Sequence, residues 1–160
     1  MEKAILELLE NDAKMTAEQI ASSLGMSEAE VVEEIERYEE KDIIAGYKTL
    51  IDWDKVGGDG VTALIEIKVV PQRGQGFERI AARMSQYDEV DSVYLMSGAY
   101  DIAVTVNGKS LRDVASFVSD KIAPLEYVTS TATHFVLKKF KDKGVMYTNT
   151  EKNQERGYAF

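Results

Sequence analysis

The feature that most constrains the fold is the order in which hydrophobic periods change between residues 61 and 141. Apolar residues at every second position predict a strand from Val61 to Val69, which Pro71 stops. Apolar residues spaced three and four apart predict helices at Phe77–Met84 and Leu111–Ile122. Further predicted strands are Val90–Gly98, Ala99–Gly108 and Tyr127–Phe140. The elements therefore follow the order βαββαβ.

This order is the ferredoxin-like pattern, in which two helices cover one face of an antiparallel sheet. The other face needs a separate cover, because the strand at Val90–Gly98 is apolar on both sides. Val93 and Leu95 alternate there with Tyr94 and Met96. An uncovered apolar face is typical of a surface that associates with another molecule. We therefore expect the chain to form at least a dimer through this face.

Residues 1–42 have helical periods instead, and capping boxes mark where two of the helices begin. The pairs are Thr16 with Gln19 and Ser27 with Glu30. Gly25 lies between the two helices and is suited to a left-handed helix end. A first helix is predicted at about residues 2–11, from its apolar stripe. Two helices joined by so short a turn form a helix-turn-helix.

The third helix is predicted to bury one apolar face, formed by Val31, Val32, Ile35 and Tyr38. The stretch after it, IIAGYKTLID at residues 43–52, is interpreted as two short strands around Ala45 and Gly46. Such a pair would make a wing. The sequence thus indicates an α+β protein whose first 52 residues are a winged helix-turn-helix.

The stretch Trp53–Gly60 contains three glycines and breaks every period, so we interpret it as a linker. The βαββαβ domain then occupies residues 61–141, and residues 142–160 form a polar tail. These boundaries predict two modules of different composition.

Composition excludes several classes of function. The chain has no cysteine and a single histidine, and it lacks GxSxG, HExxH and glycine-rich phosphate-loop motifs. We therefore expect no enzymatic activity, no cofactor and no metal site. No apolar run reaches the roughly 18 residues of a membrane span, so we expect a soluble, cytoplasmic protein with no membrane partner.

The net charge of −9 is concentrated in the first third of the chain. Residues 1–55 contain 15 acidic and 6 basic residues, whereas residues 56–160 contain 13 of each. Within the predicted third helix, residues 28–42 carry eight acids and two bases. A helix that approaches DNA phosphates gains affinity from lysine and arginine, so this composition opposes DNA binding.

Three motifs in this order resemble the Lrp/AsnC family, the leucine-responsive regulatory protein and asparagine-synthase regulators. They are ILELLENDAKMTAEQIASSLGMS at residues 5–27, IIAGYKTLID at 43–52 and MSGAYDIAVTV at 96–106. The resemblance covers residues 1–143. It implies a winged helix-turn-helix followed by a RAM/ACT-like βαββαβ domain. It also implies dimers built by pairing the C-terminal sheets, often assembled further into octamers, and transcriptional control.

The resemblance further implies that a small effector, usually an amino acid, binds between dimers at the 96–101 hairpin. Its candidate residues are Ser97, Gly98, Ala99, Tyr100 and Asp101, joined by Thr131, Thr133 and His134 of the last strand. Asp101 would supply an anion for the ammonium group. From the residues alone, Gly98 could equally serve a left-handed turn, Tyr100 could be core, and the threonines could be ordinary strand formers.

The candidate DNA contacts, by the same resemblance, are Lys14, Thr16, Ser27, Glu28, Ala29, Arg37 and Lys48. Glu33 and Glu34 stand where the family often has arginine, and Arg37 is expected to share its charge with Glu33 and Glu40. Two hypotheses remain open. The chain is either an effector-responsive regulator that binds DNA, or a metabolite-sensing oligomer whose acidic head binds a protein.

Overall fold

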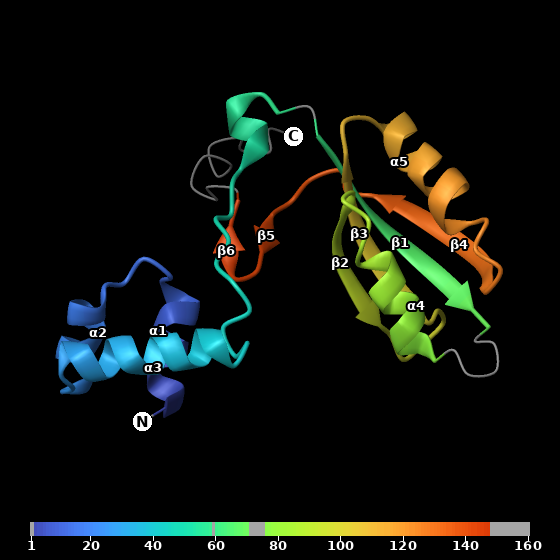
Figure 1. The fold of residues 1–160 in the computed structure, drawn as a ribbon. Helices are drawn as coiled ribbons and strands as arrows, with labels where there is room; N and C mark the ends of the chain where they lie inside the picture. Colours follow the sequence, from blue (N-terminus) through green and yellow to red (C-terminus); the bar gives the residue numbers. More distant parts are fainter. Residues whose placement is uncertain (1, 59, 71–75, 148–160) are drawn as a thin grey trace, which may run out of the picture. The chain divides into compact units, whose positions relative to one another are not determined.

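The computed structural model describes residues 2–58, 60–70 and 76–147 (Figure 1). The chain divides into two compact units, Met1–Leu50 and Ile51–Phe160. The first unit is helical, and the second contains an antiparallel sheet with helices. The α+β class expected from the sequence is confirmed.

The N-terminal unit consists of three helices, α1 (Glu2–Asn11), α2 (Ala17–Leu24) and α3 (Glu28–Glu40). Both predicted capping boxes are present, at Thr16 for α2 and at Ser27 for α3. Gly25 ends α2 in the left-handed region with φ 68°, as predicted. Local hydrogen bonds therefore set the tight turn between α2 and α3.

The core of this unit forms where one stripe of each helix meets the other two. It consists of Ile5, Leu9, Ile20, Ala21, Val31 and Tyr38. The expectation that Val32 belongs to this core is wrong, because its side chain is 39% exposed. Val31 and Tyr38, seven residues apart, already supply the inward stripe of α3, and Val32 is turned by about 100° from Val31.

The predicted two-stranded wing is also wrong, since residues 43–52 contain no strand. The backbone N–H groups of Ile43 and Ile44 donate to the Tyr38 carbonyl oxygen at 2.8 and 3.1 Å, and Asp42 has a left-handed φ of 53°, so these bonds form a cap that ends α3. The segment then runs on in coil. No strand of the described residues pairs with this segment, so its strand-forming residues remain in coil.

The predicted linker contains a short 3-10 helix, η1 (Trp53–Val56), which ends at Gly57 with φ 74°. Asp59 lies outside the described residues. Gly57 therefore ends a local element, and the predicted linker is not wholly irregular.

The C-terminal unit contains a four-stranded antiparallel sheet with strand order β2-β3-β1-β4. The strands are β1 (Val61–Val69), β2 (Val90–Leu95), β3 (Ile102–Gly108) and β4 (Val128–Phe135). The helices are α4 (Phe77–Met84) and α5 (Leu111–Phe117), which a π-helical turn, η2 (Val118–Ile122), continues. This is the predicted ferredoxin-like arrangement.

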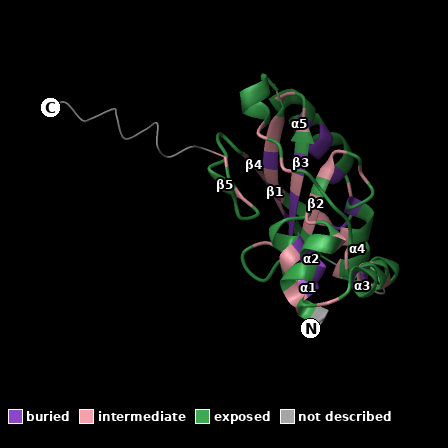
Figure 2. Ribbon diagram, turned by 90° about the vertical axis from the view of Figure 1, so that its left-hand side faces the viewer, coloured by how far each residue is buried: buried purple, intermediate pink, exposed green. Residues whose placement is uncertain are grey.

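One face of the sheet packs against the helices and forms the core. Ile65 and Ile67 of β1 and Val104 of β3 meet Ile80 and Met84 of α4, and all five are fully buried. Buried positions, purple in Figure 2, follow the central strands β1 and β3. The alternation that predicted β1 thus marks the side chains that fill this core.

The opposite face, which we call the open face, is less apolar than predicted. The register gives it Leu64 and Glu66 of β1, Ala103 and Thr105 of β3, and Tyr94 of β2. Leu95 is paired with Ile102 and therefore belongs to the helix-covered side, although it is 55% exposed. The open face is mixed in polarity, with Tyr94 51% exposed.

Four predicted strand boundaries change. β2 ends at Leu95 and β3 begins at Ile102, so their connection is longer than a turn at Gly98 and Ala99. β4 begins at Val128 and ends at Phe135; the Val136 N–H still donates to the Thr62 carbonyl oxygen of β1 at 2.9 Å, and the chain then continues in coil. In the predicted tail, β5 (Lys141–Asp142) pairs with β6 (Val145–Met146). Pro71 and residues 148–160 lie outside the described residues.

Candidate DNA-binding and effector sites

The outward side of α3 carries Glu28, Ala29, Val32, Glu33 and Glu36, all exposed, and we call these five residues the α3 surface. Ala29 and Val32 are one turn apart, so a small apolar strip lies between carboxylates. Carboxylates repel phosphates, but glutamate can accept a hydrogen bond from a cytosine amino group, and apolar side chains contact thymine methyl groups. The α3 surface therefore suits base edges better than the DNA backbone.

Ser27 and Glu30 bind each other at the start of α3. The Ser27 backbone N–H and hydroxyl both donate to Glu30 Oε2, at 2.9 and 2.7 Å, and the Glu30 N–H donates to the Ser27 hydroxyl at 3.3 Å. The bonds from the Ser27 backbone and side chain hold the pKa of Glu30 below its ordinary value. The Ser27 hydroxyl proton is thus already engaged within the helix cap.

Arg37 is paired within its own helix. Its guanidinium forms an ion pair with Glu34, and it lies over the Tyr38 ring at 5.4 Å from the ring centroid. Glu34, three residues before Arg37 on the same helix, is thus one partner of its charge. A phosphate would have to compete with a carboxylate already in contact with the guanidinium.

The other predicted DNA contacts are exposed in the same unit. Lys14 lies in the turn before α2, and Thr16 caps α2 by accepting from the Gln19 N–H at 3.2 Å. Lys48 lies in the coil after α3. These residues add positive charge or hydroxyl groups at the helix starts and in the coil, while the α3 surface adds negative charge.

The 96–101 hairpin joins β2 to β3 and is closed by the Met96 N–H, which donates to the Asp101 carbonyl oxygen at 2.8 Å. Its tip is Ser97–Tyr100, in which Ser97, Gly98 and Ala99 are exposed. No hydrogen bond between described residues uses the backbone N–H groups of the tip. Such N–H groups can bind an anion such as a carboxylate.

Gly98 does not adopt the left-handed conformation that a tight turn would require. A Cβ atom added at Gly98 would meet no atom within 4 Å. Neither backbone conformation nor space within the chain therefore requires glycine at this position. The missing side chain leaves room for a molecule that approaches the tip.

Asp101 makes a contact that the sequence did not indicate. Its Oδ2 accepts a hydrogen bond from the Val69 backbone N–H at 2.9 Å, and its own N–H donates to the Ile67 carbonyl oxygen at 3.0 Å. The partners are more than thirty residues away in sequence, so no local motif could reveal them. The carboxylate connects the hairpin to the end of β1.

The three predicted residues of β4 do not share one face. Thr131 and Thr133 are paired with Ile67 and Ile65, on the helix-covered side, whereas His134 is paired with Leu64 on the open face. His134 Nε2 lies 3.5 Å from Glu66 Oε2. Within one chain, His134 and the two threonines therefore cannot line one small pocket.

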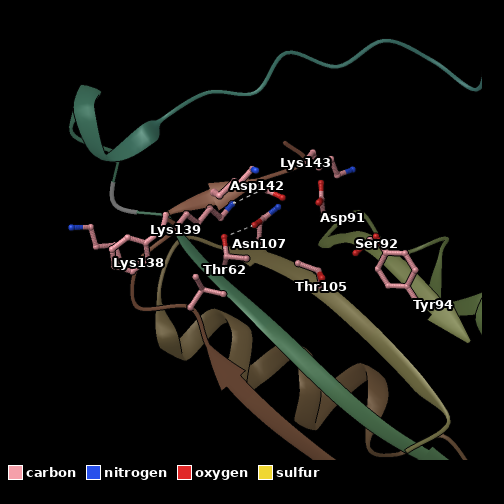
Figure 3. A pocket seen from close by; sticks show the side chains of 13 residues that line it. Thr62, Asp91, Ser92, Tyr94, Thr105, Asn107, Lys138, Lys139, Asp142 and Lys143 are labelled. Carbon is pink, nitrogen blue, oxygen red and sulfur yellow. Dashed lines mark hydrogen bonds and ion pairs between the residues drawn. The ribbon is translucent and has the colours of Figure 1, made fainter. Parts of the chain in front are cut away.

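A hollow of about 580 Å³ lies between the open face and residues 136–143 (Figure 3). Thr62 and Asn107, joined by a 2.9 Å hydrogen bond, lie at its floor, and Lys139 pairs with Asp142 at 3.9 Å at its rim. Lys138, Lys141 and Lys143 also line it. The lysine-rich run KKFKDK at residues 138–143 could have indicated this hollow from the sequence. Its first three residues were instead assigned to the predicted last strand.

The profile described as the Lrp/AsnC ligand binding domain matches residues 62–146. The uncharacterized HTH-type transcriptional regulator YugG of Bacillus subtilis is 47% identical over 147 residues, covering 91% of this chain and 89% of that protein. The chain belongs to the Lrp/AsnC family. Its members are transcriptional regulators and not enzymes, in agreement with the function class expected from the sequence.

Two solved structures share this fold. AsnC of Escherichia coli is 25% identical with a TM-score of 0.64, covering 86% of this chain and 91% of that one. The regulator NMB0573 of Neisseria meningitidis, solved in complex with L-Met, is 22% identical with a TM-score of 0.69, covering 88% and 90%. The match to the Lrp/AsnC ligand binding domain includes the hairpin, β4 and the hollow.

Within the described ranges, no helix of this Lrp/AsnC regulator is long and apolar enough to cross a membrane. The same ranges hold no group of three or more histidine, cysteine, aspartate or glutamate residues placed to bind a metal ion. The candidate sites are therefore the α3 surface, the hairpin tip and the hollow.

Proposed function

We propose that this Lrp/AsnC regulator responds to an amino acid that binds at the hairpin tip, and that it binds operator DNA through α2 and α3. The observation that carries the effector site is the tip itself, whose N–H groups take part in no hydrogen bond between described residues and which includes a glycine with open space around it. An amino-acid carboxylate fits such donors. The complex of the Neisseria regulator with L-Met supports an amino acid as the effector class.

A thermal-shift screen of the twenty amino acids tests the effector proposal. A ligand that binds only the folded protein at 100 times its dissociation constant stabilises it by about 2.7 kcal/mol. We expect at least one amino acid to raise the melting temperature, and Gly98→Val to remove that shift. Leu111→Val, an exposed position on α5, is the matched control. No shift with any amino acid would refute the proposal.

Operator binding is tested by gel shift with the DNA upstream of the protein's own gene, at low salt. The acidic α3 surface predicts few phosphate contacts, and hence a shallow dependence of affinity on salt. A steep dependence would contradict this prediction. Absence of binding, with or without amino acids, would favour the second candidate function, in which the acidic head binds a basic protein. That alternative is favoured by the five-residue α3 surface, which contains no base.

We also propose a dimer that pairs the open faces of two sheets, with octamers as a further assembly. Leu64 and Tyr94 give this face apolar area, and the small side chain of Ala103, which is paired with Tyr94 and Glu66, would let two sheets approach closely. Native mass spectrometry of the parent is expected to show even oligomers. Leu64→Lys should yield monomer, whereas Leu111→Lys, on α5, should not.

The module boundaries at residues 52–53 and 60–61, and a cytoplasmic location with the DNA, form part of the same proposal. Limited proteolysis tests the boundaries. We expect the first cuts between residues 43 and 60, which are largely exposed. First cuts inside the sheet would contradict them.

A further inference from the structure

Asp101 uses three of its polar groups to hold the base of the hairpin. Its carbonyl oxygen accepts from Met96 N–H at 2.8 Å, its N–H donates to Ile67 at 3.0 Å, and its Oδ2 accepts from Val69 N–H at 2.9 Å. The first bond closes the hairpin. The other two fasten it to β1.

The register of β1 and β3 shows what the carboxylate replaces. Val61 is paired with Gly108 and Ile67 with Ile102, so continuation of the same ladder would place Tyr100 opposite Val69. The ladder stops before that pair, and the Val69 N–H donates to the Asp101 side chain instead. A side-chain oxygen thus takes the place of a backbone carbonyl. An N–H left without such an acceptor in a half-buried position would be unfavourable.

Because the Asp101 carboxylate replaces a backbone carbonyl as acceptor, the tip is not part of the sheet. Because Val69 is satisfied by a side chain, residues 97–100 are not needed to complete the ladder, and their N–H groups stay available. On the other edge of β1 the register with β4 shifts between Lys68 and Val69, and the Thr129 hydroxyl donates to the Lys68 carbonyl oxygen at 3.1 Å. At Lys68 and Val69, side chains of Thr129 and Asp101 therefore form hydrogen bonds to the β1 backbone, one on each edge of the strand.

We propose that Asp101 is a positioning residue of the effector site. By capping β1 at Val69 it sets the tip apart from the sheet, with its N–H groups directed to the effector's carboxylate, and it does not serve as the partner of the effector's ammonium group. This inference rests on the proposed effector function of the hairpin and differs from the role that family resemblance implied for Asp101. What the site needs at this position is a hydrogen-bond acceptor, not a negative charge.

Two variants separate acceptor from charge. Asp101→Asn keeps an oxygen that can accept from Val69 N–H but removes the charge, whereas Asp101→Ala removes both. If Asp101 positions the tip, Asp101→Asn should bind the best amino acid of the screen within about threefold of the parent, and Asp101→Ala should lose about tenfold or more. Loss of binding in Asp101→Asn, equal to that in Asp101→Ala, would overturn the proposal and assign the carboxylate to the ammonium group.

Hydrogen exchange of the effector-free protein gives a readout that does not depend on binding. Peptides covering residues 67–70 and 96–101 should exchange about tenfold faster in Asp101→Ala, and at the parent's rate in Asp101→Asn. Unchanged exchange in Asp101→Ala would overturn the positioning role. If the parent binds no amino acid, the effector proposal fails while exchange still decides the role of Asp101. If Asp101→Ala does not fold, binding by Asp101→Asn alone decides between charge and acceptor.

Discussion

The two units differ in how far apart along the chain their stabilising polar contacts lie. In the N-terminal unit the capping bonds join residues three apart, as in Thr16 with Gln19. In the C-terminal unit the Ser110 cap of α5 is also local, but side-chain bonds of the sheet span 32 residues from Val69 to Asp101 and 45 from Thr62 to Asn107. The helical unit is thus specified locally, and the sheet unit by pairing between distant segments. The candidate sites differ in the same way: one helix forms the α3 surface, whereas the hairpin tip depends on a bond to the distant strand β1.

The largest expected effect comes from breaking either core. Ile20 and Ile65 are fully buried in separate clusters. Truncation to alanine should lower the free energy of unfolding by about 2–5 kcal/mol at either site. Because the clusters are separate, Ile20→Ala should destabilise only the helical unit and Ile65→Ala only the sheet unit. Hydrogen exchange resolved by peptide measures this.

Each variant serves as the other's control in that experiment. Faster exchange throughout the chain in both variants would show that the units unfold together. In that case the two units would differ in the sequence separation of their polar contacts but would not unfold independently.

The contrast explains what the sequence could and could not predict. The capping boxes, the left-handed Gly25 and the helical stripes were predictable, since each depends on residues within one turn. The βαββαβ order was predictable because alternation reports one buried face. The absence of a wing was not predictable, because residues 43–52 have strand-forming side chains but pair with no strand of the described residues.

The candidate site divides in the same way. Exposure of the hairpin tip followed from its glycine and its place between two strands. The bond from Val69 to Asp101 did not, since it depends on the register of β1 with β3. The separation of His134 from Thr131 and Thr133 was predictable from alternation alone, yet the family resemblance had grouped them. The resemblance proposed the segment, and the strand register showed on which face of the sheet each of its side chains lies.

The next largest effect concerns charge on the α3 surface. Glu33→Lys with Glu36→Lys changes the net charge by +4 and should raise DNA affinity at low salt by about tenfold or more, because each new phosphate contact adds roughly 0.9 to the salt slope. Fluorescence anisotropy at several salt concentrations measures both quantities. The control is Glu7→Lys with Glu10→Lys, which makes the same charge change on α1.

Equal gains from the α1 and α3 variants would mean that overall charge matters and that the α3 surface does not face DNA. A larger gain from the α3 variant would place that surface against the phosphates. No gain from either would favour the protein-binding alternative for the head.

A smaller effect is expected at Gly25 in the helical unit. Its φ of 68° is unfavourable for residues with a Cβ, although no atom lies within 4 Å of the position that a Cβ would take. Gly25→Ala should therefore destabilise this unit by about 1–2 kcal/mol through backbone strain alone. Chemical denaturation measures the change. A stability equal to that of the parent would show that the left-handed cap is not maintained in solution.

Gly98 in the sheet unit gives the smallest effect on stability and the most informative comparison with Gly25. It has equally open space for a Cβ but an ordinary backbone conformation. Gly98→Ala should therefore change the free energy of unfolding by less than about 0.5 kcal/mol. Effector affinity, measured by calorimetry, should nonetheless fall, because the methyl group would occupy space at the tip. If Gly98→Ala destabilised the unit as much as Gly25→Ala does, glycine at this position would serve the fold, and the strongest reason for placing a ligand at the tip would be lost.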